Sequence, residues 1–303
     1  MENKFNLPES AVKFLDYLHT NNKSPNTIVG YESDLHVFYE FLKEYKKAKK
    51  ITNKIIQSLI LDDLNNFLSY TKTKQKKNSE CARARKVSTL KSYFSYMYEN
   101  NIIKEDIAKG LKKITIGKKI PIAFNDEQVE KIFSSLTEGK LNYYRDKCIV
   151  TLLFKTGIRV SELANIKLNN IQVNKLLVIR KGNKEDSVFL NKQCIEAIND
   201  YLKYRNVDNV TEEEKQYLFI SRLKKRITKK SVENIMKDLY EKAELTDKKY
   251  VTHTARHTVG TNVYKKTKDI LMVAKVLGHN NINTSKIYIT MDDEDVMNVM
   301  ENL

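Results

Sequence analysis

The chain has 303 residues, 41% hydrophobic and 30% charged, which is enough for a substantial core and for two domains. No apolar run is long enough for a membrane span, and the three widely spaced cysteines exclude a disulfide or zinc framework, so we expect a cytoplasmic protein. The formal net charge of +16 is shared by both halves of the chain and favours a polyanion as partner, although a lysine-rich surface is also common in proteins from low-GC genomes.

Helical periodicity covers the first hundred residues. A first helix ends at residues 20–22, and Ser24, followed by proline, predicts the N-cap of a second. The spacing predicts a third helix over residues 53–70, with Ile60 among its inward-facing side chains. Ser79 then caps a fourth helix. Four helices of this length predict a small bundle.

A basic loop precedes the fourth helix, and further cations lie along one side of that helix. Such a loop and face suit the DNA backbone, although an ordinary solvated surface explains the helix equally well. The candidate DNA-binding residues of this region are Lys74, Lys76, Lys77, Arg83, Arg85, Lys86 and Lys91.

A glycine, a proline and several lysines interrupt the helical pattern after the bundle. We therefore expect an N-terminal domain over residues 1–113, a linker over 114–122 and a C-terminal domain over 123–303. In the second domain, Asn125 predicts a capping box, an apolar helix ends at Gly157, and residues 175–190 predict a β-hairpin. The predicted fold is mainly α, with one small antiparallel sheet in the second domain.

Four stretches of the second domain concentrate groups suited to phosphate chemistry. Arg159 follows the glycine that ends the apolar helix, and Lys181 and Lys184 flank the predicted hairpin tip. Gly278 predicts a helix C-cap, which places His279 in a joint and Tyr288 shortly after it. Each signal is weak on its own, because arginines often cap helices and hairpin lysines are usually only solvated.

The remaining stretch is His253-Thr254-Ala255-Arg256-His257. The two histidines lie four residues apart and share a helix face. A metalloprotease helix needs a glutamate where Thr254 stands, and Arg256 repels a cation, so we expect no metal here.

In their order and spacing, the segments TGIRVSEL, KGNKE, HTARH and LGH, with a tyrosine nine residues after the last histidine, resemble the tyrosine recombinases. This family of site-specific DNA recombinases includes the Xer proteins and phage integrases. The resemblance covers nearly the whole chain and implies an N-terminal core-binding, SAM-like domain followed by a catalytic domain. Two positions depart from the pattern. Ala255 replaces a usual leucine, and Asp186 replaces a usual basic residue, which predicts a weaker phosphate contact at the hairpin.

The resemblance also implies a mechanism without metal, cofactor or ATP. Tyr288 attacks the phosphodiester and forms a 3′-phosphotyrosyl bond, while Arg159 and Arg256 hold the non-bridging oxygens. His253 accepts or positions a proton, and His279 donates a hydrogen bond to the phosphate. The proton for the 5′-oxygen comes from Lys181, with Lys184 as second candidate and as a DNA contact.

Duplex DNA is the implied substrate, bound by a dimer at each site and by a tetramer in the synapse, with no membrane partner. The C-terminal tail, residues 291–303, docks either on a neighbouring subunit or on its own domain, and a related recombinase is a possible second subunit. Three alternatives stay open: a chromosomal Xer-type recombinase or a mobile-element integrase, a type IB topoisomerase-like relaxing activity, and a non-catalytic DNA-binding protein.

Overall fold

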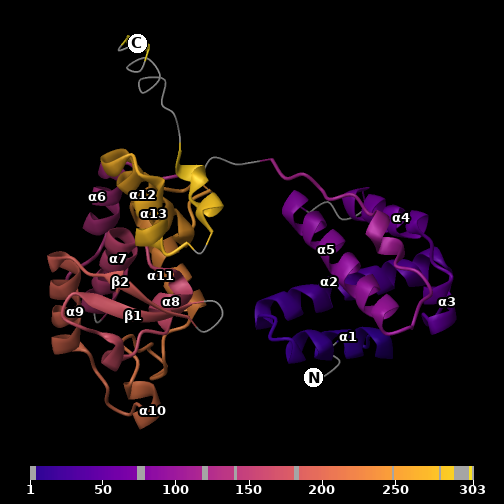
Figure 1. The fold of residues 1–303 in the computed structure, drawn as a ribbon. Coiled ribbons are helices and arrows are strands. Elements are labelled where there is room, and N and C mark those ends of the chain that lie inside the picture. Colours follow the sequence, from indigo (N-terminus) through magenta and orange to yellow (C-terminus); the bar gives the residue numbers. More distant parts are fainter. Residues whose placement is uncertain are drawn as a thin grey trace. The chain divides into compact units, whose positions relative to one another are not determined.

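The computed structural model describes residues 5–73, 79–117, 122–139, 142–180, 184–247, 249–279, 281–289 and 300–301. The chain forms two compact units, Met1–Lys118 and Lys119–Leu303 (Figure 1). Both are mainly helical, and the described part contains one two-stranded antiparallel sheet, which confirms the predicted fold class. In the same part of the chain, every helix is too short or too polar to cross a membrane.

The first unit is a helical bundle. Its elements are α1 (Glu9–Thr20), α2 (Pro25–Tyr45), α3 (Asn53–Gln57), α4 (Leu61–Thr73), α5 (Glu80–Glu99) and the 3₁₀ turn η1 (Ile107–Gly110). The two predicted caps are confirmed, because Ser24 accepts a hydrogen bond from the backbone of Thr27 and Ser79 from that of Ala82, both at 3.2 Å. Aromatic rings fill the centre, where Phe38 meets the edge of Phe67 at 5.1 Å between centroids.

The predicted single helix over residues 53–70 is wrong, because the helix is interrupted between α3 and α4. The Asp63 carboxylate accepts the backbone N–H of Ile60 at 2.9 Å, which starts a new helix at Leu61. Ile60 therefore lies outside both helices and is 61% exposed instead of facing inward.

The second unit surrounds a long buried helix. Its α-helices are α6 (Asp126–Ser134), α7 (Tyr143–Thr156), α8 (Val160–Ala164), α9 (Lys192–Tyr204), α10 (Glu212–Lys215), α11 (Lys229–Lys242), α12 (Thr252–Thr267) and α13 (Ile270–Leu277). Its strands are β1 (Lys175–Arg180) and β2 (Lys184–Phe189), and its 3₁₀ turns are η2 (Leu168–Asn170), η3 (Ile282–Thr284) and η4 (Lys286–Tyr288). The Asn125 capping box and the hairpin are both confirmed. Apolar α7 packs against α9 and α12, so it anchors the elements that carry the site.

Candidate active site

Two helix ends meet at one buried arginine. Gly157 ends α7 with φ +65° and Gly278 ends α13 with φ +61°, a left-handed conformation that favours glycine. Arg256 on α12 donates from Nη1 to the carbonyl of Gly157 and from Nη2 to that of Leu277 at 2.6 Å. Residues that are 99 and 21 positions away from Arg256 are thereby joined at one point.

Arg159 lies at the same joint. Its Nη1 is 2.6 Å from Oε1 of Glu162, and its Nη2 donates to the carbonyl of Gly278 at 3.3 Å. About a third of its side chain is exposed, whereas Glu162 is buried. Glu162 also accepts the backbone N–H of Arg159, so it fixes both ends of this residue. The guanidinium is thus held in place with part of its surface open to an anion.

Three histidines line this region, and burial lowers the pKa of each. The pKa of His257 falls to about 4, with His253 and Arg256 adding to the effect of burial. The pKa of His279 also falls to about 4 through burial and the charges of Arg256, Arg159 and Arg180, and that of His253 is lowered by burial and by Arg256. The two histidines with a pKa near 4 are therefore neutral at pH 7 and can accept or donate a hydrogen bond.

Tyr288 is packed inside the unit and is 2% exposed. Its hydroxyl lies 3.0 Å from Nδ1 of His257, and its ring stacks on that of His279 at 6.4 Å between centroids. A Cβ atom on Gly260 would come within 2.6 Å of the tyrosine ring, so α12 accepts the ring only because position 260 is glycine. The Ser285 hydroxyl, 2.7 Å from Nδ1 of His279, holds η4 to the α13 end.

Burial and the neighbouring positive charge shift the pKa of Tyr288 in opposite directions. Burial raises the pKa of Tyr288, while the nearby charge of Arg256 lowers it. Burial, reinforced by Arg159, lowers the pKa of Arg256 to about 10, so this guanidinium stays charged at pH 7. Two cations kept close together in a partly buried site provide a place for a doubly contacted anion such as a phosphodiester.

Arg159 and His253 also line an open pocket of about 600 Å³ between α8, α11 and the start of α12. Lys229, Lys230 and Lys237 on α11 belong to the same lining. These lysines were not among the expected DNA contacts. Their spacing along one helix gives one basic side, but only the fold shows that this side borders Arg159.

The other expected DNA contacts differ in how exposed their side chains are. Lys184 is exposed at the start of β2, and Arg83 and Lys91 are partly exposed on α5. Lys86 is buried, with its Nζ 3.2 Å from Asp34, and the half-exposed Arg85 makes two hydrogen bonds to the same carboxylate at 2.8 and 2.9 Å. The candidates Lys74, Lys76, Lys77 and Lys181 lie outside the described residues, as does most of the tail over 291–303.

Three residues without an expected role also lie at the site. His257 faces the Tyr288 hydroxyl, Glu162 holds Arg159, and Arg180 lies against Glu162 with Nε 3.7 Å from Oε1. His257 is part of the HTARH segment, but its partner lies 31 residues away. Glu162 belongs to the TGIRVSEL segment and Arg180 to the predicted hairpin, yet their proximity depends on how β1 packs.

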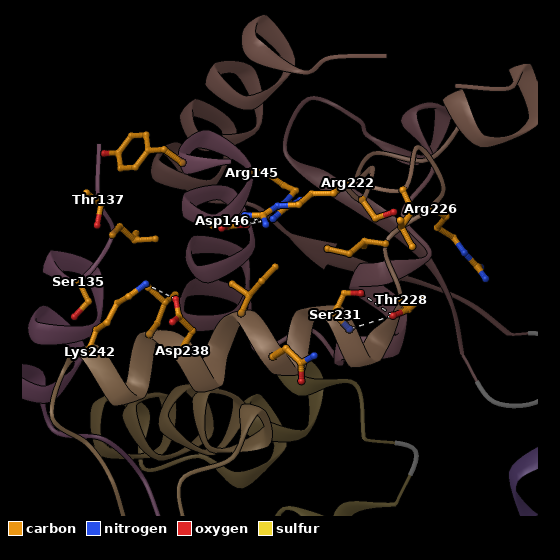
Figure 2. A pocket seen from close by; sticks show the side chains of 18 of the residues that line it. Ser135, Thr137, Arg145, Asp146, Arg222, Arg226, Thr228, Ser231, Asp238 and Lys242 are labelled. Carbon is orange, nitrogen blue, oxygen red and sulfur yellow. Dashed lines mark hydrogen bonds and ion pairs between the residues drawn. The ribbon is translucent and has the colours of Figure 1, made fainter. Parts of the chain in front are cut away.

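A second pocket of about 530 Å³ lies among α6, α7, α11 and the loop before α11 (Figure 2). Its polar side chains largely satisfy one another: Arg145 pairs with Asp146 at 2.8 Å, Lys242 pairs with Asp238, and the hydroxyls of Thr228 and Ser231 lie 2.9 Å apart. None of Arg159, His253, Arg256, His279 and Tyr288 lines it, so this pocket is separate from the cluster at Arg256. Across the described ranges, no group of three or more His, Cys, Asp or Glu side chains could hold a metal ion.

Comparison with protein families gives two matches. Residues 123–295 match the phage integrase family, and residues 11–101 match the N-terminal SAM-like domain of phage integrases. A tyrosine recombinase XerC of Caldanaerobacter subterraneus is 38% identical, over 95% of this chain and 85% of the relative. A tyrosine recombinase XerC of Leptospira interrogans is 29% identical, over 97% and 92%.

Solved structures share the fold. The XerH site-specific recombinase bound to palindromic difH substrate, in a post-cleavage complex, superposes with a TM-score of 0.79 at 21% identity, covering 96% of this chain and 94% of that one. A lambda integrase dimer bound to a COC' core site gives 0.68 at 14% identity, over 93% and 94%.

Proposed function

Because the chain belongs to the phage integrase family and is a tyrosine site-specific DNA recombinase, we propose that the cluster at Arg256 cleaves and rejoins the strands. The observation that supports this most directly is the convergence of Arg159, His279 and Tyr288 on that arginine, although they are far apart in the sequence.

In the proposed reaction, the oxygen of Tyr288 attacks phosphorus, the bond from phosphorus to the 5′-oxygen breaks, and a 3′-phosphotyrosyl bond replaces it. Arg159 and Arg256 stabilise the charge that grows on the non-bridging oxygens. His253 accepts or positions the phenol proton, His279 donates a hydrogen bond to the phosphate, and Lys181 protonates the leaving 5′-oxygen. Since one ester replaces another, a 5′-hydroxyl of a partner strand reverses the step without ATP.

Attack also requires that Tyr288 leave its buried position. The phenol is held by His257 and packed on Gly260, so it is closed to a substrate in this arrangement. We propose that engagement of DNA moves η4 and brings the phenol to the phosphate.

The substrate we propose is a duplex recombination site in the cytoplasm, bound by a dimer and joined in a tetrameric synapse. The XerC names of both reported relatives favour a Xer-type recombinase over a mobile-element integrase. The N-terminal unit is the proposed core-binding domain, and the chain after residue 122 the proposed catalytic domain.

A trapping experiment tests the nucleophile. The recombination site is first identified by sequencing the DNA that becomes covalently bound to the protein in its source cell. A nicked suicide substrate of that site then captures the adduct on a denaturing gel. We expect an adduct with the wild type and with Tyr264→Phe, a matched control on α12 beside the same apolar cluster. Tyr288→Phe binds the site normally and gives none.

The same assay in EDTA separates this mechanism from metal-dependent cleavage, because no proposed step uses a metal. An adduct formed by Tyr288→Phe, or abolition of cleavage by EDTA, would overturn the proposal.

A further inference from the structure

Arg180 is a charged residue enclosed beside the active site. It ends β1, immediately before the hairpin tip, and only 4% of its side chain is exposed. Its guanidinium occupies the space next to Gly278, where a Cβ atom would lie 0.9 Å from Nη1. A buried guanidinium is costly to the fold unless anions face it. The buried charge of Arg180 therefore requires nearby anions.

Two carboxylates face Arg180, one from β2 and one from α8. Oδ2 of Asp186, on β2, lies 2.6 Å from Nη1, and Oε1 of Glu162, on α8, lies 3.7 Å from Nε. Neither of these two nitrogens makes a hydrogen bond of normal geometry, so the contacts are mainly electrostatic. Asp186, which departs from the basic residue usual in the family, thus has a cationic partner within its own hairpin.

Two neighbours of Arg180, Glu162 and Gly278, also hold Arg159. Glu162 accepts the 2.6 Å hydrogen bond from Arg159 with the oxygen that faces Arg180. Gly278, against which Arg180 packs, accepts the 3.3 Å bond from the other terminal nitrogen of Arg159. Removing Arg180 would therefore take a neighbouring contact away from both partners of Arg159 at once.

We propose that Arg180, held by Asp186, is a positioning residue that keeps Glu162 and Gly278 in place and so orients Arg159 toward the scissile phosphate. This inference rests on the proposed phosphate-binding role of Arg159. It adds a residue from the hairpin to the machinery of the site without any direct contact between Arg180 and DNA.

The test compares two substrates that differ in the charge of the scissile phosphate. In the second substrate a methyl group replaces one non-bridging oxygen, and the resulting methylphosphonate is neutral. A neutral linkage makes little demand on a guanidinium, so a defect caused by a misplaced Arg159 should largely disappear. A general structural defect should slow both reactions equally.

Arg180→Met keeps much of the apolar stem and removes the charge. We expect its cleavage of the phosphodiester to fall about 10²-fold, as for a misplaced catalytic group, and its methylphosphonate cleavage to change less than about threefold. Asp186→Asn, on a more exposed side chain, should show a smaller loss with the same preference. Arg159→Ala supplies the reference pattern.

Arg205→Met is the matched structural control. Arg205 donates to the carbonyls of Leu218, Lys215 and Tyr217 in the same unit, so any loss should be equal on both substrates. Equal losses for Arg180→Met and Asp186→Asn on both substrates, or phosphodiester cleavage by Arg180→Met near the wild-type rate, would overturn the inference alone. An Arg159→Ala variant that fails equally on both substrates would overturn the proposed role of Arg159 and the inference with it.

Discussion

The two guanidinium groups at the site differ in burial and in the groups that they bind. Arg256 is buried and satisfies two backbone carbonyls, whereas Arg159 is partly exposed and bound to Glu162. We therefore expect a substitution at 256 to affect both the fold and the proposed chemistry, and one at 159 to affect mainly the proposed chemistry.

Arg159→Ala should remove about 3 kcal/mol of transition-state stabilisation, because one donor to the developing charge is lost. The cleavage rate should therefore fall by roughly two orders of magnitude. Arg256→Ala should lose at least as much and also lower the melting temperature, since two carbonyls lose their donors. Single-turnover cleavage and thermal unfolding measure the two effects. Cleavage by Arg159→Ala within tenfold of the wild type would contradict the prediction.

The site histidines should make stability fall in mild acid. His257 and His279 have pKa values of about 4 in the fold, below the ordinary value near 6.5 that applies after unfolding. Between these values the unfolded chain binds more protons, so stability is fully present above about pH 6.5 and declines toward pH 4. Urea unfolding at several pH values tests this. His257→Gln should flatten the decline, whereas an unchanged slope would mean that His257 does not contribute.

Short motifs single out individual residues of the site, and their catalytic roles stay predictions. Arg159, His253, Arg256, His279 and Tyr288 were singled out from the sequence, and the structure places all five around one joint. Arg180 could not be assigned in this way, because its partners come from α8 and β2 and meet only after the hairpin packs.

At the scale of elements, capping chemistry predicted helix starts better than periodicity predicted helix lengths. Ser24, Ser79 and Asn125 cap helices as expected, since a cap is a local hydrogen bond. The break between α3 and α4 was missed because the apolar spacing continues across it. The deciding bond from Ile60 to Asp63 looks in the sequence like any acidic residue early in a helix.

One of the buried carboxylates of the N-terminal bundle, that of Asp34 on α2, joins α2 to α5. It accepts bonds from Arg85, Lys86 and Thr89 on α5. Asp34→Ala should destabilise the unit by about 3–5 kcal/mol, because it removes the anion that faces the buried Lys86 ammonium. Chemical denaturation of the full chain measures this.

Asp16→Ala, at an exposed position of α1, is the control and should change stability by less than about 0.5 kcal/mol. Combining Asp34→Ala with Lys86→Met should recover part of the loss, since the buried charge is then gone. A loss of Asp34→Ala as small as the control's would show that the cluster is not stabilising.

At the scale of the whole molecule, the net charge of +16 predicts DNA affinity that falls steeply with salt. Lys229, Lys230 and Lys237, which line the pocket at Arg159, are well exposed, and their ion pairs with neighbouring glutamates are weak enough to yield to phosphate. Replacing all three by glutamine should reduce the slope of log affinity against log salt by about 2 to 3.

The matched control replaces Lys192, Lys203 and Lys215 on α9 and α10, outside the pocket at Arg159. This triple variant has the same net charge and should keep most of the wild-type slope. Equal slopes for the two variants would show that the lysines of the pocket at Arg159 have no special role in binding DNA. Composition alone indicated a polyanion but could not say which lysines border the site.

The enclosed position of Tyr288 has a consequence for fidelity. A cation-rich protein meets DNA in many brief, sequence-independent encounters while it searches for its site. Because the phenol is packed against Gly260, we expect that such encounters do not nick the strand and that cleavage waits until recognition has reshaped the 286–288 turn.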